Sequence, residues 1–248
     1  MASEKTLAIV LRVIEFSETS CVVTLFTEDF GKVSALAKGA RRPKGPFESA
    51  LDLLAVVRIV FLHNSSEALD LLTEARLVRR FRAAARDLTR LYAGYYVAEL
   101  LSELTSEGDS QRELFQAADL ALQGLEGNDE PAAVILRFEL AALRHLGHGP
   151  GVTECVECGG EIGSSGRISF GLLAGGVMCS RCRVGKRQVV NLSRGAVETL
   201  RTFQARPETT LDLPAAVRGE VRGLMNQYVC VLLGQRPKLH PYLAALTR

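Results

Sequence analysis

Four cysteines form two closely spaced pairs in the second half of the chain. Cys155 and Cys158 enclose two residues, and Cys179 and Cys182 repeat this spacing after 20 intervening residues. Each Cys-x-x-Cys turn can direct two thiolates toward one point, and two such turns close a tetrahedral site of four sulfurs, which suits zinc. Glycines follow Cys158 and let the backbone turn tightly around a metal. We therefore predict one structural zinc ion bound by these four cysteines.

A disulfide or a redox pair is the main alternative for these cysteines. Structural disulfides are rare in cytosolic proteins, and a redox motif needs two cysteines, not four. A zinc ion with four sulfur ligands has no open position for water, so we expect it to stabilise the fold and not to catalyse a reaction. His145 and His148 could each replace a missing thiol, although a histidine at a helix end is the simpler interpretation.

The sequence contains no catalytic template. Gly31-Lys32-Val33 and Gly185-Lys186-Arg187 lack the remaining residues of a phosphate-binding P-loop, and neither Gly-x-Gly-x-x-Gly nor Gly-x-Ser-x-Gly occurs. Glu99 and Glu103 have the spacing that carboxylates commonly have on a solvated helix. We therefore predict that the protein is not an enzyme.

Basic residues gather in short stretches, although the net charge is only +2, from 30 basic and 28 acidic residues. The loop from residue 37 to 47 carries four cations among glycines and prolines that forbid regular structure: Lys38, Arg41, Arg42 and Lys44. Beside a barrel face, such cations can follow the phosphates of a nucleic acid through salt-sensitive contacts. Lys32 precedes this loop and belongs to the same basic stretch. A solvated loop is the alternative interpretation.

A second basic stretch runs from residue 76 to 90, where six arginines accompany only Asp87. Arg79, Arg82, Arg86 and Arg90 share one face of a predicted helix and would extend the basic surface, unless that face is simply solvated. Residues 95–130 are acidic instead, because nine carboxylates accompany only Arg112. Acidic helices of this kind suit the docking of partner proteins.

The first 78 residues alternate between apolar and polar positions. This period of two predicts strands over residues 7–13, 21–27, 33–37, 51–62 and 69–77, with a hairpin at 28–32. Five short strands in this length favour a small closed barrel of the OB type, which binds oligonucleotides. A simple antiparallel sheet is the alternative.

Beyond residue 81 the apolar positions recur every three or four residues, which predicts helices. They cover residues 81–104, 111–125, 193–203 and about 217–231, and a third helix has Asn128 or Asp129 as its cap, Pro131 in its first turn and Gly147 just past its end. We predict an α+β multidomain fold. The OB barrel occupies residues 1–78, the α-helical domain residues 79–150 and 190–248, and the inserted zinc finger residues 151–189.

No apolar run reaches the roughly 20 residues that cross a bilayer. The N-terminus also lacks the basic, apolar and small-residue regions of a signal peptide. We therefore expect a cytoplasmic protein.

Several short stretches, taken in order, carry a family resemblance that spans essentially the whole chain. They are Val10-Leu11-Arg12 with Glu18-Thr19-Ser20, Leu25-Phe26-Thr27-Glu28-Asp29-Phe30-Gly31-Lys32, Ala37-Lys38-Gly39-Ala40-Arg41-Arg42-Pro43, Leu136-Arg137-Phe138-Glu139-Leu140, Leu146-Gly147 ahead of the first cysteine pair, and Phe170 with Gly175-Gly176 ahead of the second. As a set, these stretches resemble the bacterial RecO family of DNA repair and recombination mediator proteins.

The resemblance implies an OB barrel, a helical domain and a zinc finger inserted in it. It also implies binding to single- and double-stranded DNA and annealing of complementary strands without a nucleotide. Together with RecR, such a protein helps to load RecA onto DNA coated by single-strand-binding protein (SSB), at the nucleoid in the cytoplasm. On this resemblance Lys38, Arg41 and Arg42 face DNA, with Lys44 and Arg12 as neighbours. Arg137 would meet the acidic tail of SSB.

Two other classes of protein fit parts of the sequence. An OB barrel combined with a zinc ribbon also suits a protein that binds structured RNA. A protein adaptor would use the acidic helices of residues 95–130 and would not touch nucleic acid. Neither alternative includes strand annealing.

Overall fold

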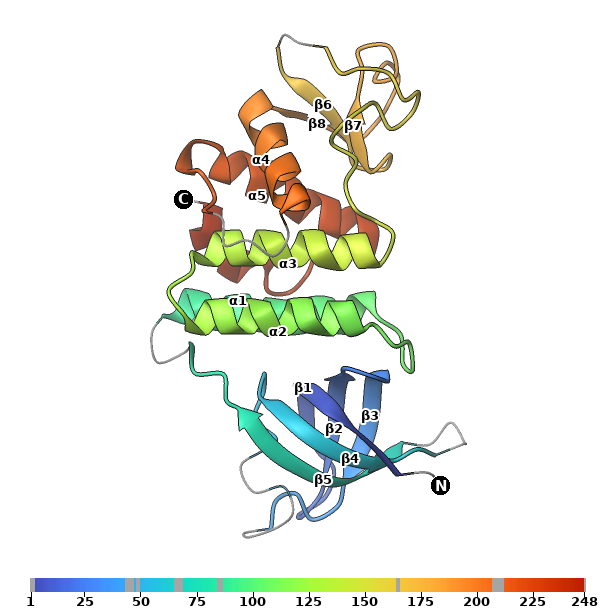
Figure 1. The fold of residues 1–248 in the computed structure, drawn as a ribbon, viewed down its shortest axis with the longest axis vertical. Helices are drawn as coiled ribbons and strands as arrows, with labels where there is room; N and C mark the ends of the chain where they lie inside the picture. Colours follow the sequence, from blue (N-terminus) through green and yellow to red (C-terminus); the bar gives the residue numbers. More distant parts are fainter. Residues whose placement is uncertain are drawn as a thin grey trace.

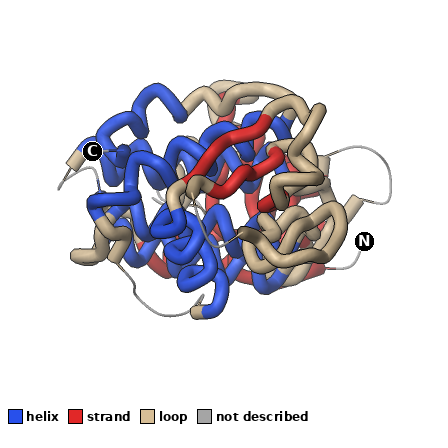
Figure 2. The backbone as a smooth tube through the Cα atoms, turned by 90° about the horizontal axis from the view of Figure 1, so that it is seen from above, coloured by secondary structure: helices blue, strands red, loops and turns tan. Residues whose placement is uncertain are grey.

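The computed structural model describes residues 3–42, 47, 50–64, 69–83, 87–163, 166–206 and 212–247. The molecule is elongated, with a β-barrel at one end, helices in the middle and a small three-stranded sheet at the other end (Figure 1). The predicted α+β organisation is confirmed. Viewed along the long axis, the small sheet and its loops lie over the helices, and the barrel strands lie beneath (Figure 2).

Five strands close the barrel: β1 (Ser3–Glu15), β2 (Cys21–Thr27), β3 (Gly31–Ala37), β4 (Val56–Leu62) and β5 (Asp70–Arg79). Around the barrel the order is β1-β2-β3-β5-β4. The pairing of β3 with β5 is parallel and the other pairings are antiparallel, as in the Greek-key barrel of the OB fold. Every second residue of a strand points inward, so that Ala8, Val10, Val23 and Leu25 help to fill a core of the barrel's own.

The fourth strand is shorter than predicted. It begins at Val56 and not at Leu51, because the chain turns at Leu54, which has a φ of 63°. The Leu54 N–H donates to the Val10 carbonyl at 2.8 Å, and the Val10 N–H donates to the Ala55 carbonyl at 3.0 Å. Leu54 packs against the helices whereas Ala55 packs inside the barrel. The turn therefore places apolar residues both in the core of the barrel and in the core of the helices. This is why residues 51–55 have the apolar pattern of a strand.

Five α-helices follow: α1 (Leu88–Leu104), α2 (Arg112–Glu126), α3 (Pro131–His145), α4 (Arg194–Ala205) and α5 (Ala215–Leu233), with a final 3-10 helix at His240–Thr247. Helices α1 and α2 lie between the barrel and the other helices (Figure 1). One apolar core contains residues of the helices together with Ile9 and Phe26, which lie on the outer face of the barrel. Barrel and helices are therefore packed directly on one another.

Helix α1 begins well after its predicted start, whereas α2, α3 and α4 each begin within two residues of theirs. Helix α1 begins at Leu88 and not at Phe81, because the Asp87 carboxylate accepts the Thr89 N–H at 3.0 Å and caps the helix. The prediction that Arg79, Arg82, Arg86 and Arg90 share one helix face is therefore wrong, since Arg79 ends β5, Arg82 precedes α1 and Arg86 lies outside the described residues. Glu130 is the residue before α3, one position after the predicted caps, while Pro131 is in its first turn as predicted.

Three short strands form the sheet at the far end: β6 (Ile168–Gly171), β7 (Gly176–Met178) and β8 (Val189–Leu192), in the order β7-β6-β8. Strand β8 leads straight into α4 through Ser193, whose hydroxyl accepts the Ala196 N–H. The predicted end of the insertion at residue 189 coincides with the first residue of β8. The domain boundaries stay predictions.

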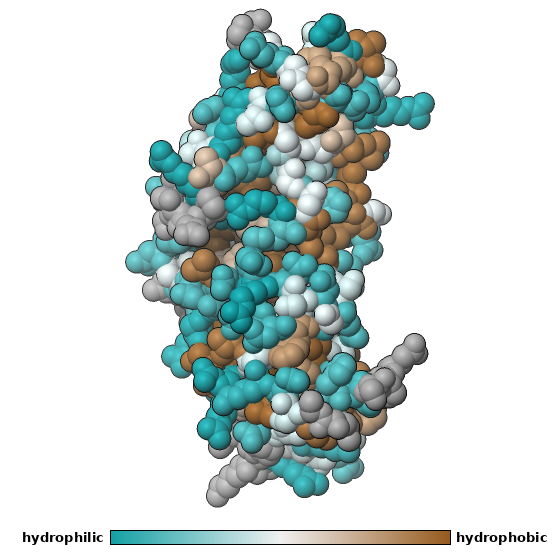
Figure 3. All heavy atoms as spheres, turned by 45° about the vertical axis from the view of Figure 1, so that its right-hand side comes forward, coloured by the Kyte–Doolittle hydropathy of each residue, from teal (hydrophilic) through white to brown (hydrophobic). Residues whose placement is uncertain are grey.

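The surface in Figure 3 is mainly hydrophilic, and the hydrophobic residues visible on this face are interrupted by hydrophilic ones. Among the residues that the structure describes, no helix combines the length and apolarity needed to cross a membrane.

Candidate functional site

The structure brings the four predicted cysteines together in one cluster. Their sulfur atoms all lie within 4.8 Å of one another, and the Sγ atoms of Cys158 and Cys179 are 3.9 Å apart. Four sulfurs bound tetrahedrally to one zinc ion at about 2.3 Å would be about 3.8 Å apart. None of the six cysteines, all of which the structure describes, forms a disulfide. The cluster can hold one metal ion.

Tight turns after each pair of cysteines explain how the sulfurs converge. The Gly159 N–H donates to the Cys155 carbonyl at 2.8 Å, and Gly159 has a φ of 68°, a conformation that glycine adopts without strain. In the second turn the Arg183 N–H donates to the Cys179 carbonyl at 3.1 Å. Cys155 is buried and Cys158 is exposed. The cluster therefore lies at the surface, with only Cys155 of its four cysteines buried.

The thiols of this cluster have strongly different proton affinities. Burial raises the pKa of Cys155, but backbone N–H groups at Cys179, Glu157 and Cys158 outweigh burial and lower this pKa to about 6. Hydrogen bonds with Cys158 and Cys179 raise the pKa of Cys182 to about 12. Neighbouring sulfurs share protons in this way because they cannot all ionise without a compensating charge. A divalent cation supplies that charge, so the donor set fits a metal.

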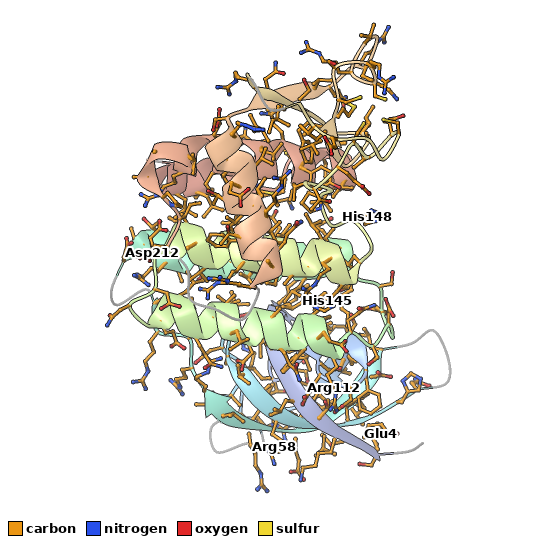
Figure 4. All side chains as sticks on the ribbon, turned by 45° about the horizontal axis from the view of Figure 1, so that its top comes forward. Glu4, Arg58, Arg112, His145, His148 and Asp212 are labelled. Carbon is orange, nitrogen blue, oxygen red and sulfur yellow. The ribbon has the colours of Figure 1, made fainter. Side chains whose placement is uncertain are left out.

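His145 and His148, the two histidines that could replace a missing thiol, are not needed to complete the group of four ligands. His145 and His148 lie at the end of α3 and just beyond it (Figure 4). The group of four is composed of cysteines alone.

Three predicted DNA-binding cations lie in one exposed segment after β3, which we call the cationic loop (residues 38–42). Lys38, Arg41 and Arg42 are all exposed. The Arg41 N–H donates to the Thr19 carbonyl at 3.1 Å, and the Gly39 N–H donates to the Ser20 hydroxyl at 3.4 Å. The cationic loop is therefore attached to the turn between β1 and β2. Lys44 lies outside the described residues.

The cations of this loop are accessible to a ligand. The Arg41 guanidinium lies 3.0 Å from the Glu15 carboxylate, but the two side chains are 42% and 73% exposed. An exposed ion pair of this kind contributes at most about 1 kcal/mol and can be exchanged for another anion. Arg12, on the outer face of β1, is also exposed and makes no ion pair within the described part of the chain.

The structure engages Lys32 and Arg79 in contacts between the barrel and the helices. The Lys32 ammonium donates to the carbonyls of Ser102 and Thr105 at 2.7 and 2.6 Å, where α1 ends and the helix dipole is negative. Arg79 forms ion pairs with Asp119 and Glu126 of α2. Arg112 of α2 makes a similar link to Asp29, close to the barrel (Figure 4). Sequence reasoning missed these contacts because the partners are far apart in the chain.

Arg137 lies in a groove between α2 and α3. The groove has a volume of about 460 Å³, and Leu120, Phe138, Arg144 and His145 also line it. The Arg137 side chain is 17% exposed and lies 3.4 Å from Asp129. The groove thus combines apolar surface with basic groups.

A closed Greek-key barrel with a cationic loop, packed on helices that carry a four-cysteine cluster, defines an OB-fold protein with an insertion whose cysteines can hold a metal ion. A family model described as Recombination protein O N terminal matches residues 1–81, and one described as Recombination protein O C terminal matches residues 85–240. The chain belongs to the RecO family of DNA repair proteins.

Curated relatives agree with the family models over nearly the full length. The chain is 42% identical to the DNA repair protein RecO of Rhodopirellula baltica, with 96% of this chain and 97% of the relative covered. It is 34% identical to the protein of the same name from Myxococcus xanthus, with 96% and 95% covered. It is 32% identical to that of Symbiobacterium thermophilum, also with 96% and 95% covered.

Proposed function

We propose that the protein is a non-enzymatic recombination mediator that binds single- and double-stranded DNA and anneals complementary strands without a nucleotide. It acts with RecR, at the nucleoid in the cytoplasm, to load RecA onto DNA coated by SSB. Membership of a DNA repair family supports the process. The observation that carries the mechanism is the cationic loop, whose exposed Lys38, Arg41 and Arg42 follow a strand of the OB barrel.

Charge neutralisation explains annealing without catalysis. Two DNA strands repel each other through their phosphates, and Lys or Arg side chains that replace the bound counterions remove part of this repulsion. Contacts to phosphate leave the base edges free to pair. Arg12 and Lys44 extend the proposed surface. Lys32 and Arg79 stay predicted members of the DNA-binding surface. Because both side chains already bind groups of the helices, we expect them to contribute less to DNA binding.

Salt dependence tests this function. If Lys38, Arg41, Arg42, Lys44 and Arg12 each replace a counterion on single-stranded DNA, the logarithm of the binding constant falls with the logarithm of salt concentration with a slope of about −3.5. Fluorescence anisotropy of a labelled oligonucleotide over a salt titration measures this slope. An affinity that does not depend on salt contradicts the mechanism. Equal competition by RNA would favour an RNA-binding protein instead.

The four cysteines, in this proposal, bind one zinc ion with a structural role. Their convergence and the shared protonation of their thiols support this assignment. When bound, zinc supplies the positive charge that lets all four sulfurs ionise and so holds the two turns together.

Removing the metal is expected to unfold the insertion and leave the barrel intact. Native mass spectrometry should find one zinc ion per chain, and the Cys158→Ser/Cys182→Ser variant should lose it. Hydrogen exchange in residues 155–182 should then accelerate, because the turns depend on the metal for their stability, while exchange in β1 to β5 stays slow. The Cys230→Ser variant is the matched control and should keep its metal. A native protein without metal but with a protected insertion would contradict the assignment.

We assign the acidic tail of SSB to the groove between α2 and α3. Arg137 and Arg144 offer positive charge, and Leu120 and Phe138 offer apolar surface. Glu113 and Asp129 also line the groove, so an acidic tail would have to displace Asp129 as a partner of Arg137.

A further inference from the structure

We propose that Phe16 is a stacking site for one unpaired base of single-stranded DNA. This inference rests on the proposed function, because it names the chemical group that the barrel would bind besides phosphate. It changes the mechanism from binding by charge alone to binding that distinguishes single strands from duplexes. The argument depends on the exposure of Phe16, on the turn that carries it and on the cations beside it.

Phe16 differs from every other phenylalanine of the barrel. Phe26, Phe47 and Phe61 are buried, and Phe30 packs edge-on against Phe61 with ring centroids 5.5 Å apart. Phe16 is 65% exposed. A single exposed apolar side chain is common on protein surfaces, so exposure alone does not define a site.

The turn that carries Phe16 is an ordered one. The Phe16 N–H donates to the Ser20 carbonyl at 3.0 Å, and the Ser17 N–H donates to the same carbonyl at 3.1 Å. The Ser20 N–H in turn donates to the Ser17 hydroxyl at 3.2 Å. These bonds close the connection between β1 and β2 and hold the ring outside the barrel. In OB folds this connection and the face of β2 and β3 are the surfaces that bind oligonucleotides.

The same turn is attached to the cationic loop. Hydrogen bonds from Arg41 to Thr19 and from Gly39 to Ser20 fix the two loops to each other. These loops lie at the ends of β2 and β3 that are far from the helices, since the Gly31 end of β3 contacts the connection between α1 and α2. An aromatic ring and several cations are thereby presented together at the exposed end of the barrel. A stacking ring beside a positively charged groove is the arrangement by which proteins bind single strands.

The outer face of β1 continues this surface. After the irregularity between Val10 and Arg12, alternate residues point outward, which places Arg12 and Ile14 in line with Phe16. Ile14 is itself 41% exposed. The nearby carboxylates belong to Glu15, which pairs with Arg41, to the exposed Glu18, and to Glu99 of α1, which lines a pocket together with Arg12. Phosphates would replace Glu15 as the partner of Arg41.

Stacking predicts a preference for single strands. In a duplex the faces of the bases are covered by their neighbours, so a ring at the surface has no base to stack on without unstacking the helix. The cations contact phosphates in both forms of DNA. Removal of the ring should therefore weaken binding to single strands and leave binding to duplexes nearly unchanged.

Intrinsic fluorescence gives a direct test, because the chain contains no tryptophan. Phe16→Trp introduces a single tryptophan at the proposed site, and its emission can be excited separately from that of the five tyrosines. Leu173→Trp is the matched control, since Leu173 is 70% exposed in the turn between β6 and β7, at the other end of the molecule. Addition of oligothymidine should quench the emission of Phe16→Trp and leave that of Leu173→Trp unchanged. In parallel, anisotropy with labelled DNA should show that Phe16→Ala lowers affinity for the single strand by roughly tenfold, whereas Phe16→Trp keeps it.

The possible results separate this inference from the proposed function. If the native protein binds single strands but Phe16→Ala binds them equally well and the emission of Phe16→Trp does not change, stacking is wrong and DNA binding stands. Equal losses on single strands and duplexes would also overturn stacking. If none of the variants nor the native protein binds DNA, the proposed function and this inference both fail.

Discussion

Replacement of Glu139 by alanine is expected to lower the free energy of unfolding by about 3–5 kcal/mol. Glu139 of α3 is fully buried and forms an ion pair with Arg222 of α5, which is 1% exposed. The Tyr96 hydroxyl of α1 donates to the same carboxylate at 2.8 Å, and the His240 ring lies 3.2 Å from that hydroxyl. Loss of the carboxylate leaves a buried guanidinium without its counter-charge, which is the costly case for a buried ion pair.

The protonation of this network supports the ionised pair. Burial opposes the charge on the guanidinium, but the Glu139 carboxylate outweighs it and raises the pKa of Arg222. Burial, and then the Glu139 charge, raise the pKa of Tyr96, so its hydroxyl keeps the proton that it donates. Charge and hydrogen bonds therefore join three helices and the final 3-10 helix at one point.

Urea unfolding followed by circular dichroism measures the loss. The control is Glu198→Ala, because Glu198 is 69% exposed and pairs with Arg201 within one helix, and we expect this variant to lose less than about 1 kcal/mol. The double variant Glu139→Leu/Arg222→Met should be much more stable than Glu139→Ala, since it removes both charges. A loss for Glu139→Ala as small as that of the control would show that the pair does not stabilise the helical core.

The second large effect concerns DNA. The variant Arg41→Glu/Arg42→Glu is expected to bind single-stranded DNA at least about 25-fold more weakly at about 0.1 M salt, because two phosphate contacts are lost and repulsion is added. The loss should be alike for all sequences, since phosphate contacts carry no sequence information. Fluorescence anisotropy with several labelled oligonucleotides measures it.

A charge reversal elsewhere on the barrel provides the matched control. Arg58 of β4 (Figure 4) is paired in register with Arg76 of β5, and both residues are exposed. Arg58→Glu/Arg76→Glu changes the net charge equally, but at positions outside the proposed surface. Because salt screens charges beyond about 10 Å, we expect its affinity to stay close to that of the native protein. Equal losses in both variants would mean that net charge, and not the cationic loop, governs binding.

Sequence patterns predicted best where local spacing alone determines the structure. The bounds of β2, Cys21 to Thr27, are those that the apolar pattern predicted, and each Cys-x-x-Cys turn brings its own two sulfurs to one side. Helix α4 begins at Arg194, one residue after the predicted start at Ser193, which caps it. In each case the sequence pattern that allowed the prediction spans only a few residues.

Contacts between distant segments explain what the sequence could not reveal. Leu54 lies in an apolar stretch that predicts a strand. The chain turns at this residue because the Leu54 side chain packs in the core that contains the helices. Lys32 and Lys38 belong to the same basic stretch of the sequence. The Lys32 ammonium nevertheless binds carbonyls at the end of α1. Phe16 cannot be told from Phe26 by residue type, and only the closed barrel shows which ring is buried.

Annealing of two complementary, dye-labelled oligonucleotides by the purified, zinc-loaded protein tests the central claim most directly. The reaction contains no nucleotide and is followed over a salt titration for the native protein, Arg41→Glu/Arg42→Glu and Arg58→Glu/Arg76→Glu. We predict annealing by the native protein and by the second variant, weakened by salt, and none by the first variant. Absence of annealing by the folded native protein, or full annealing by Arg41→Glu/Arg42→Glu, would contradict a mediator that acts through the cationic loop.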